Sequence, residues 1–142
     1  MLSSMAPAIV LRNGEPSMSL GAPGGTRIFA AVCQAIINII DFGMTIQQAV
    51  EAPRIWTMGI PGTDGEKLHV EPGFSEETLD KLRAKGHEVV EMPKIAGGMN
   101  GILVDSATGL MHGGACWRAD GTPMGISGGP AHPRALLSPP PV

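Results

Sequence analysis

An apolar helix, predicted over residues 27–41, constrains the fold of this chain more than any other segment. Its apolar positions recur at intervals of three and four residues, with a second apolar flank beside them. We therefore expect a helix that is buried over most of its circumference, which requires a sheet or other helices around it. The apolar residues are Ile28, Phe29, Ala31, Val32, Cys33, Ala35, Ile36, Ile37, Ile39 and Ile40.

A β-hairpin is predicted ahead of this helix. Residues 8–11 form a continuous apolar run, and Asn13-Gly14 is a favoured pair for a two-residue hairpin turn. The return strand is expected over residues 15–20. Because the first strand is apolar on both of its faces, we expect it to be covered on both sides.

Caps and turn residues indicate the remaining elements. Thr45 and Gln48 have the spacing of a capping box for a short helix that Pro53 ends. Ser75 is the expected cap of another helix, with Gly86 just past its end. Short strands are predicted at residues 68–70 and 89–90, and a second hairpin at 102–105 and 110–113.

This order of elements predicts a layered α/β or α+β fold in one domain. We place the structured region at residues 1–120. Residues 121–142 are rich in Gly, Pro and Ser, and we expect this tail to be poorly ordered or docked only by partners.

Composition argues against several classes of partner. The formal net charge is −3 and the chain has three Phe, two Trp and no Tyr, so it lacks the basic stripe and stacking residues of nucleic-acid binding. No apolar run approaches the roughly 18 residues of a membrane span. The first residues lack the basic and apolar regions of a secretory signal, which leaves a periplasmic or a cytoplasmic location open.

No cofactor or metal is expected from the cysteines and histidines. Cys33 and Cys116 lie far apart, and Cys33 is predicted to be a small buried thiol in the apolar helix. The four histidines are scattered, without the spacing of metal ligands.

Two short segments could bind an anionic substrate. Gly24 and Gly25 lie between a strand and a helix N-terminus, where backbone N–H groups can face a carboxylate or the oxyanion of an acyl-transfer intermediate. The alternative is a tight turn that only needs glycine conformations. Ser3 and Ser4 supply two hydroxyl donors for a carboxylate, although paired serines near a terminus are usually a solvated loop.

Three motifs in order give the chain a family resemblance. Residues 3–7 read Ser-Ser-Met-Ala-Pro, residues 21–27 read Gly-Ala-Pro-Gly-Gly-Thr-Arg, and residues 51–54 read Glu-Ala-Pro-Arg. Over residues 2–115 the chain resembles the small subunit of the gamma-glutamyltranspeptidase family. The resemblance implies part of a four-layer αββα sandwich of the N-terminal nucleophile hydrolase type, incomplete in this chain.

The resemblance also implies roles for individual residues. Ser3 and Ser4 match the positions that hold the substrate α-carboxylate, and the Gly24 and Gly25 amides match the oxyanion hole. Arg54 matches a family position too, but we expect it to tie a helix end to its neighbours.

The family's catalytic threonine has no counterpart here, which implies a C-terminal fragment that is inactive alone. Its expected partners are the upstream part of the same enzyme, namely the large subunit and the start of the small subunit, and a small gamma-glutamyl or related amide substrate. Residues 114–118 replace the usual Gly-Ala-Ser-Asp-Pro-Arg, which leaves room for acylase-like or amidohydrolase-like relatives. The other hypothesis is a non-catalytic α/β module that binds a small carboxylate or a partner protein.

Overall fold

The computed structural model describes residues 5–125 and has an α+β architecture. A four-stranded antiparallel sheet has the order β1-β2-β6-β7, and a three-stranded sheet has the order β3-β4-β5. The strands are β1 (Ala8–Arg12), β2 (Glu15–Gly21), β3 (Ile55–Trp56), β4 (Leu68–Val70), β5 (Val89–Glu91), β6 (Asn100–Val104) and β7 (Met111–Ala115). The helices are α1 (Ile28–Ile40), α2 (Ile46–Glu51) and α3 (Glu76–Ala84), and 3₁₀ turns cover Gly25–Arg27, Asp64–Glu66 and Trp117–Ala119.

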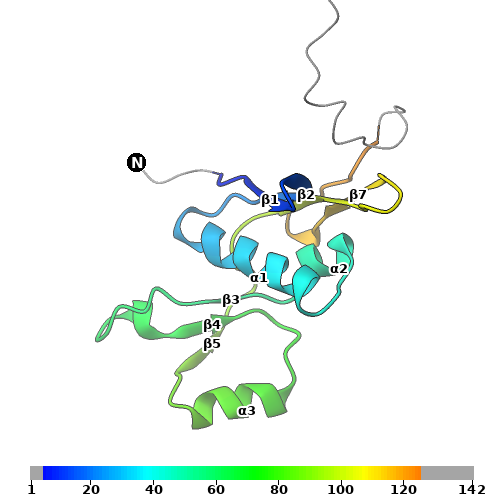
Figure 1. The fold of residues 1–142 in the computed structure, drawn as a ribbon. Helices are drawn as coiled ribbons and strands as arrows, with labels where there is room; N and C mark the ends of the chain where they lie inside the picture. The colour runs from blue at the N-terminus through cyan, green and yellow to red at the C-terminus, as the bar shows by residue number, and fades with distance from the viewer. Residues whose placement is uncertain (1–4, 126–142) are drawn as a thin grey trace, which may run out of the picture.

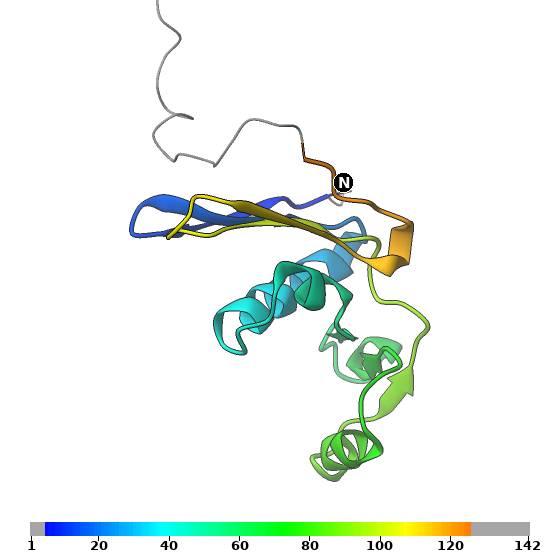
Figure 2. The ribbon, with the colours of Figure 1, turned by 90° about the vertical axis from the view of Figure 1, so that its right-hand side faces the viewer.

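The elements form layers, with α1 and α2 against one face of the larger sheet and the smaller sheet with α3 beyond the helices (Figures 1 and 2). Alternate residues of β2 point into the main core, where Met18 and Leu20 are buried. Gly101 of β6 and Gly114 of β7 let α2 approach the sheet closely. A Cβ atom on Gly114 would lie 3.1 Å from the backbone N of Gln47, so a side chain there would press on the helix backbone.

The opposite face of the larger sheet is largely open. Ile9, Ser19, Ile102 and Gly113 pair across the four strands, and Ile9 is 68% exposed and Ile102 44% exposed. The expectation that β1 is covered on both sides is therefore wrong for the described residues. Both α1 and α2 pack on the same face, which leaves the other apolar face without a covering layer among residues 5–125.

Helix α1 is also less buried than its sequence predicts. Its buried stripe is Ile28, Ala31, Val32 and Ala35, whereas Phe29 is 70% exposed and Ile40 52% exposed. Cys33 lies on an exposed part of α1, so its predicted burial is wrong. Periodicity identifies which side chains are apolar, but burial depends on whether another layer reaches them.

Local signals predict the other elements well. The hairpin turn has Asn13 and Gly14 at positive φ, and the Thr45–Gln48 capping box is present, as is the Ser75 cap of α3. Strand β3 is absent from the prediction because two residues carry no detectable alternation. Within residues 5–125, no helix combines the length and apolar character that crossing a membrane requires.

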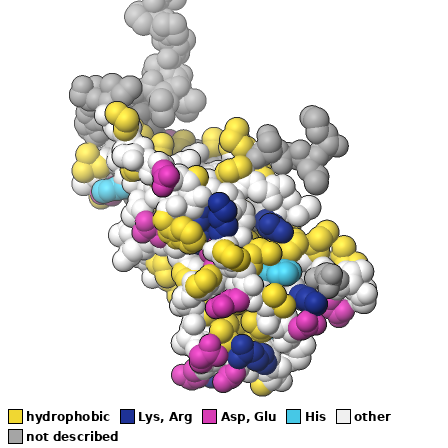
Figure 3. Space-filling view, turned by 180° about the vertical axis from the view of Figure 1, so that it is seen from behind, with side chains coloured by type: hydrophobic (Ala, Val, Ile, Leu, Met, Phe, Trp, Pro, Cys, Tyr) yellow, Lys and Arg dark blue, Asp and Glu magenta, His cyan; other side chains and the backbone are white. Residues whose placement is uncertain are grey.

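The exposed face of α3 carries charges of both signs. Lys81 pairs with Glu77 at 2.6 Å and Arg83 with Asp80 at 2.7 Å, and Figure 3 shows acidic and basic side chains mixed at this end of the molecule. These side chains are exposed, as expected for a solvated helix face.

Candidate active site

The Gly24–Gly25 turn connects β2 to α1 through the 3₁₀ turn Gly25–Arg27. Gly24 has a φ of 148° and Gly25 a φ of 59°, both in the region that favours glycine. A Cβ atom on Gly24 would lie 2.7 Å from the Ala96 Cβ, whereas a Cβ atom on Gly25 would meet no atom within 4 Å. Gly24 is therefore required for packing, and Gly25 borders open space.

The backbone around Gly25 leaves room for a ligand. Within residues 5–125, no hydrogen-bond acceptor pairs with the Gly25 N–H group. Just after it, the Arg27 guanidinium lies 4.9 Å from the centre of the Trp56 ring and ties the end of the turn to β3. The turn thus combines a constrained backbone with an unobstructed side at Gly25.

Ser3 and Ser4 lie outside the described residues. Met5, which follows Ser4 in sequence, forms an antiparallel bridge with Pro23, which precedes Gly24. The two predicted binding segments are therefore joined through their immediate sequence neighbours.

Ala96 packs against the turn in an unusual conformation. Its φ is 61°, a left-handed value that costs a non-glycine residue roughly 1–2 kcal/mol. The next residue, Gly97, donates its N–H to the Pro23 carbonyl at 2.7 Å. Such strain persists only where surrounding contacts impose it.

Those contacts come from a buried charge cluster of Arg54, Glu71 and Arg118, which are 3%, 1% and 5% exposed. Arg118 binds Glu71 through two hydrogen bonds, one of them Nε to Oε1 at 2.7 Å. Glu71 also accepts from the Ile95 N–H at 2.6 Å and from the Arg54 N–H at 2.8 Å. The carboxylate therefore anchors the start of the segment that contains Ala96.

Arg54 anchors the same segment from its other side. Its Nη1 donates to the Ile95 carbonyl at 3.0 Å and to the Gly97 carbonyl at 3.1 Å, which brackets Ala96. Its Nη2 donates to the Val50 carbonyl at 3.2 Å near the end of α2. This confirms that Arg54 ties a helix end to its neighbours.

Electrostatics within the cluster favour the charged carboxylate. Burial alone would raise the pKa of Glu71, but hydrogen bonds from Arg118 and from the Ile95 and Arg54 N–H groups lower it below its ordinary value. Burial and the neighbouring Arg118 charge lower the pKa of Arg54. Burial would also lower the pKa of Arg118, but its hydrogen bond to Glu71 raises that pKa above its ordinary value.

Sequence reasoning missed Glu71 and Ala96 as site-supporting residues. Glu71 follows β4 directly, and nothing in its neighbourhood marks it as buried; Ala96 carries no signal of a left-handed conformation. Arg118 could have been singled out, because it is the last residue of the segment 114–118 that departs from the family pattern.

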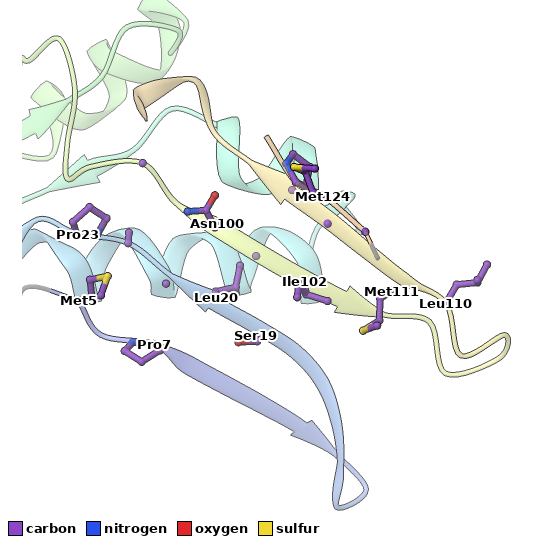
Figure 4. Close-up of a pocket in the computed structure, with 18 residues that line it drawn as sticks. Met5, Pro7, Ser19, Leu20, Pro23, Asn100, Ile102, Leu110, Met111 and Met124 are labelled. Atoms are coloured by element: carbon purple, nitrogen blue, oxygen red, sulfur yellow. The ribbon is translucent and has the colours of Figure 1, made fainter. Parts of the chain in front are cut away.

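An apolar groove of about 990 Å³ runs over the open face of the larger sheet and ends at Pro23, the residue before the Gly24–Gly25 turn. Figure 4 shows Met5 and Pro23 at one end of the groove, with Ile102 and Met111 farther along the strands. The groove follows the strands that no other described element covers.

Among residues 5–125, no cluster of three or more His, Cys, Asp and Glu side chains is placed to hold a metal ion. His69 instead packs on Trp56, with their ring centres 5.3 Å apart.

Comparison with known proteins assigns the chain to a family. The family model described as Gamma-glutamyltranspeptidase matches residues 1–126. The Acylase ACY 1 proenzyme of Pseudomonas sp. (strain SE83) is 47% identical over 97% of this chain, and the Glutathione hydrolase proenzyme of Escherichia coli (strain K12) is 40% identical over 72%. The chain covers 24% and 17% of these relatives, so it spans at most about a quarter of their length.

A solved structure supports the same assignment. The T380A mutant of Helicobacter pylori gamma-glutamyltranspeptidase matches with a TM-score of 0.74 and 36% identity, over 82% of this chain and 62% of that chain. This confirms the expected fold, of which these residues form a part. Because the family model matches most of the sequence and the fold agrees, the chain belongs to the gamma-glutamyltranspeptidase family.

Proposed function

We propose that this chain supplies the oxyanion hole and the carboxylate-binding hydroxyls of an amide hydrolase or acyltransferase whose threonine nucleophile lies outside it. The observation that carries the proposal is the Gly25 backbone, held at positive φ in the 3₁₀ turn that leads into α1, beside open space. An N–H group fixed there can stabilise the oxyanion that forms when a nucleophile attacks an amide carbonyl. The threonine hydroxyl attacks this carbonyl and takes the acyl group as an ester, while the C–N bond breaks and the amine leaves with the hydroxyl proton. Water or an acceptor amine then releases the acyl group and restores the hydroxyl.

The second binding element is the Ser3–Ser4 pair. The Met5–Pro23 bridge joins the residue after Ser4 to the residue before Gly24, which supports a common site. In this site the two hydroxyls bind the substrate carboxylate while the Gly24 and Gly25 amides face the scissile carbonyl.

Two exposed apolar surfaces support the upstream part of the same enzyme as the partner. Ile9 and Ile102 lie on the open sheet face, and Phe29 and Ile40 lie on the open side of α1. Large exposed apolar patches usually mark surfaces that another body covers. The relatives are proenzymes about four times as long, which is enough chain to cover both surfaces.

The substrate class is a gamma-glutamyl or related amide. The match to the Pseudomonas acylase covers 97% of the chain at 47% identity, which favours the acylase-like alternative within this class.

A chimeric enzyme tests the proposal. This chain replaces the 138-residue matching segment of the Pseudomonas SE83 acylase proenzyme. We expect the chimera to undergo self-cleavage and to hydrolyse amide substrates, and the 142-residue chain alone to show no turnover because it lacks the nucleophile. A soluble, folded chimera without activity would favour the non-catalytic module, and turnover by the purified chain alone would contradict the role assigned to the missing threonine.

In the same chimera, Ser3→Ala combined with Ser4→Ala should weaken substrate binding. Each hydrogen bond to a charged group contributes about 1.5–3 kcal/mol, so the loss of both should raise KM by roughly 10²-fold or more while kcat changes less. Steady-state kinetics measure both constants. Ser106→Ala, in an exposed turn, is the control. If KM in the double variant matches this control, Ser3 and Ser4 do not bind substrate.

A further inference from the structure

The sulfur of Cys116 faces two hydrogen-bond donors. It accepts from the Met99 N–H at 3.0 Å and from Arg54 Nη2 at 3.6 Å, and the residue is 2% exposed. No acceptor within residues 5–125 receives a hydrogen bond from this sulfur. A neutral thiol would direct its own proton into this set of donors, whereas a thiolate would satisfy them.

The charges of the buried cluster also favour a thiolate over a neutral thiol. Arg54 and Arg118 carry two positive charges, and Glu71 carries one negative charge. A buried charge without a partner is costly, so one further anion would make the cluster neutral. Glu51 and Asp120 line a shallow hollow beside Cys116, but both are exposed to solvent.

We infer that Cys116 is a thiolate at neutral pH, the fourth charge of a neutral buried cluster, and a positioning residue for the segment from Ile95 to Met99. Met99 follows Ala96 by three residues, and its N–H is held by the sulfur. The Cys116 N–H in turn donates to the Met99 carbonyl at 3.0 Å. The thiolate therefore holds one end of the segment while Arg54 and Glu71 hold the other end against Gly24.

The surroundings of the sulfur account for its ionisation. Burial alone would raise the pKa of Cys116. The hydrogen bond from the Met99 N–H, the neighbouring Arg118 backbone and side chain, and the Arg54 charge lower the pKa below its ordinary value.

Ultraviolet absorbance of the thiolate tests the inference directly. The sample is the full 142-residue chain carrying Cys33→Ser, which leaves Cys116 as the sole thiol. We expect the native chain to titrate well below the value of about 8.5 for an unperturbed thiol, and the denatured chain to titrate near that value. The Cys33→Ser, Cys116→Ser variant supplies the baseline. A native titration at or above the denatured one would overturn the inference.

The pH dependence of stability is an independent measurement. Because the pKa is lowered in the folded state, the thiolate's stabilisation is fully present above the unfolded pKa and is lost as pH falls through the folded pKa. The urea midpoint of Cys33→Ser should therefore exceed that of the double variant by an amount that grows with pH up to about 8.5. A difference that stays constant or shrinks as pH rises would mean that Cys116 is a neutral thiol.

The positioning role rests on the proposed function and is measured in the acylase chimera. Cys116→Ser should lower kcat with little change in KM, and Cys116→Asp, which restores a negative charge, should recover part of the loss. An unchanged kcat in Cys116→Ser would overturn the positioning role. An inactive parent chimera would instead count against the proposed function, and the titration of the isolated chain would still decide the charge of Cys116.

Discussion

Replacing Glu71 with alanine is expected to lower the free energy of unfolding by about 3–5 kcal/mol, the usual cost of removing one member of a buried ion pair. The change leaves the Arg54 and Arg118 guanidiniums buried without their carboxylate and removes the acceptor of the Ile95 N–H. The free energy of unfolding of a typical domain is only about 5–15 kcal/mol, so this substitution removes a large part of it.

Urea denaturation of the full chain measures this loss. Glu71→Gln, which keeps the shape and removes the charge, should also be strongly destabilised, whereas Glu77→Gln on the exposed face of α3 should change stability by less than about 1 kcal/mol. Since the pKa of Glu71 is lowered in the folded state, its contribution is present above the unfolded value of about 4.3 and is lost as pH falls through the folded pKa. If Glu71→Gln and Glu77→Gln have equal effects, the cluster does not hold the fold together.

In the acylase chimera, Gly25→Val should reduce kcat by roughly 10²–10³-fold, as removal of one oxyanion donor does in other enzymes. The valine needs a different backbone conformation from the φ of 59° that Gly25 adopts, and its side chain enters the open space where the substrate carbonyl approaches. Steady-state kinetics on the processed chimera measure the effect.

Gly43 provides a matched control for backbone strain. It has a φ of 65° and open space around its Cβ position, but it lies in the loop between α1 and α2. Gly43→Val should lose a similar amount of thermal stability and keep its kcat. If the Gly25→Val chimera is stable and its kcat equals that of Gly43→Val, the Gly24–Gly25 pair is only a structural turn and does not form the oxyanion hole.

Local chemistry explains why many elements were predictable. The Asn13-Gly14 turn, the Thr45 capping box and the Ser75 cap depend on residues close in sequence, and the structure has all three. The glycine requirement at Gly25 is likewise local, because it follows from a positive φ. Its catalytic role stays a prediction, as do the roles of Gly24, Ser3 and Ser4.

Burial was less predictable than element type. Phe29 and Cys33 belong to an apolar pattern, yet both are exposed because no layer among the described residues covers that side of α1. Conversely, the charged residues Glu71 and Arg118 are buried, since each satisfies the other's charge across 47 residues of sequence.

The sequence by itself determined the helices and hairpins, the positions that require glycine at a turn, and the family, because these depend on neighbouring residues and ordered motifs. Only the tertiary structure decided how the Gly24 turn is supported: it brings Arg54, Glu71 and Arg118 around the strained Ala96 and places Ala96 against Gly24. The physical reason is that a buried charge is stable only when an oppositely charged partner lies beside it. Here the partners are far apart in sequence, so the residues next to each charge do not indicate the pairing.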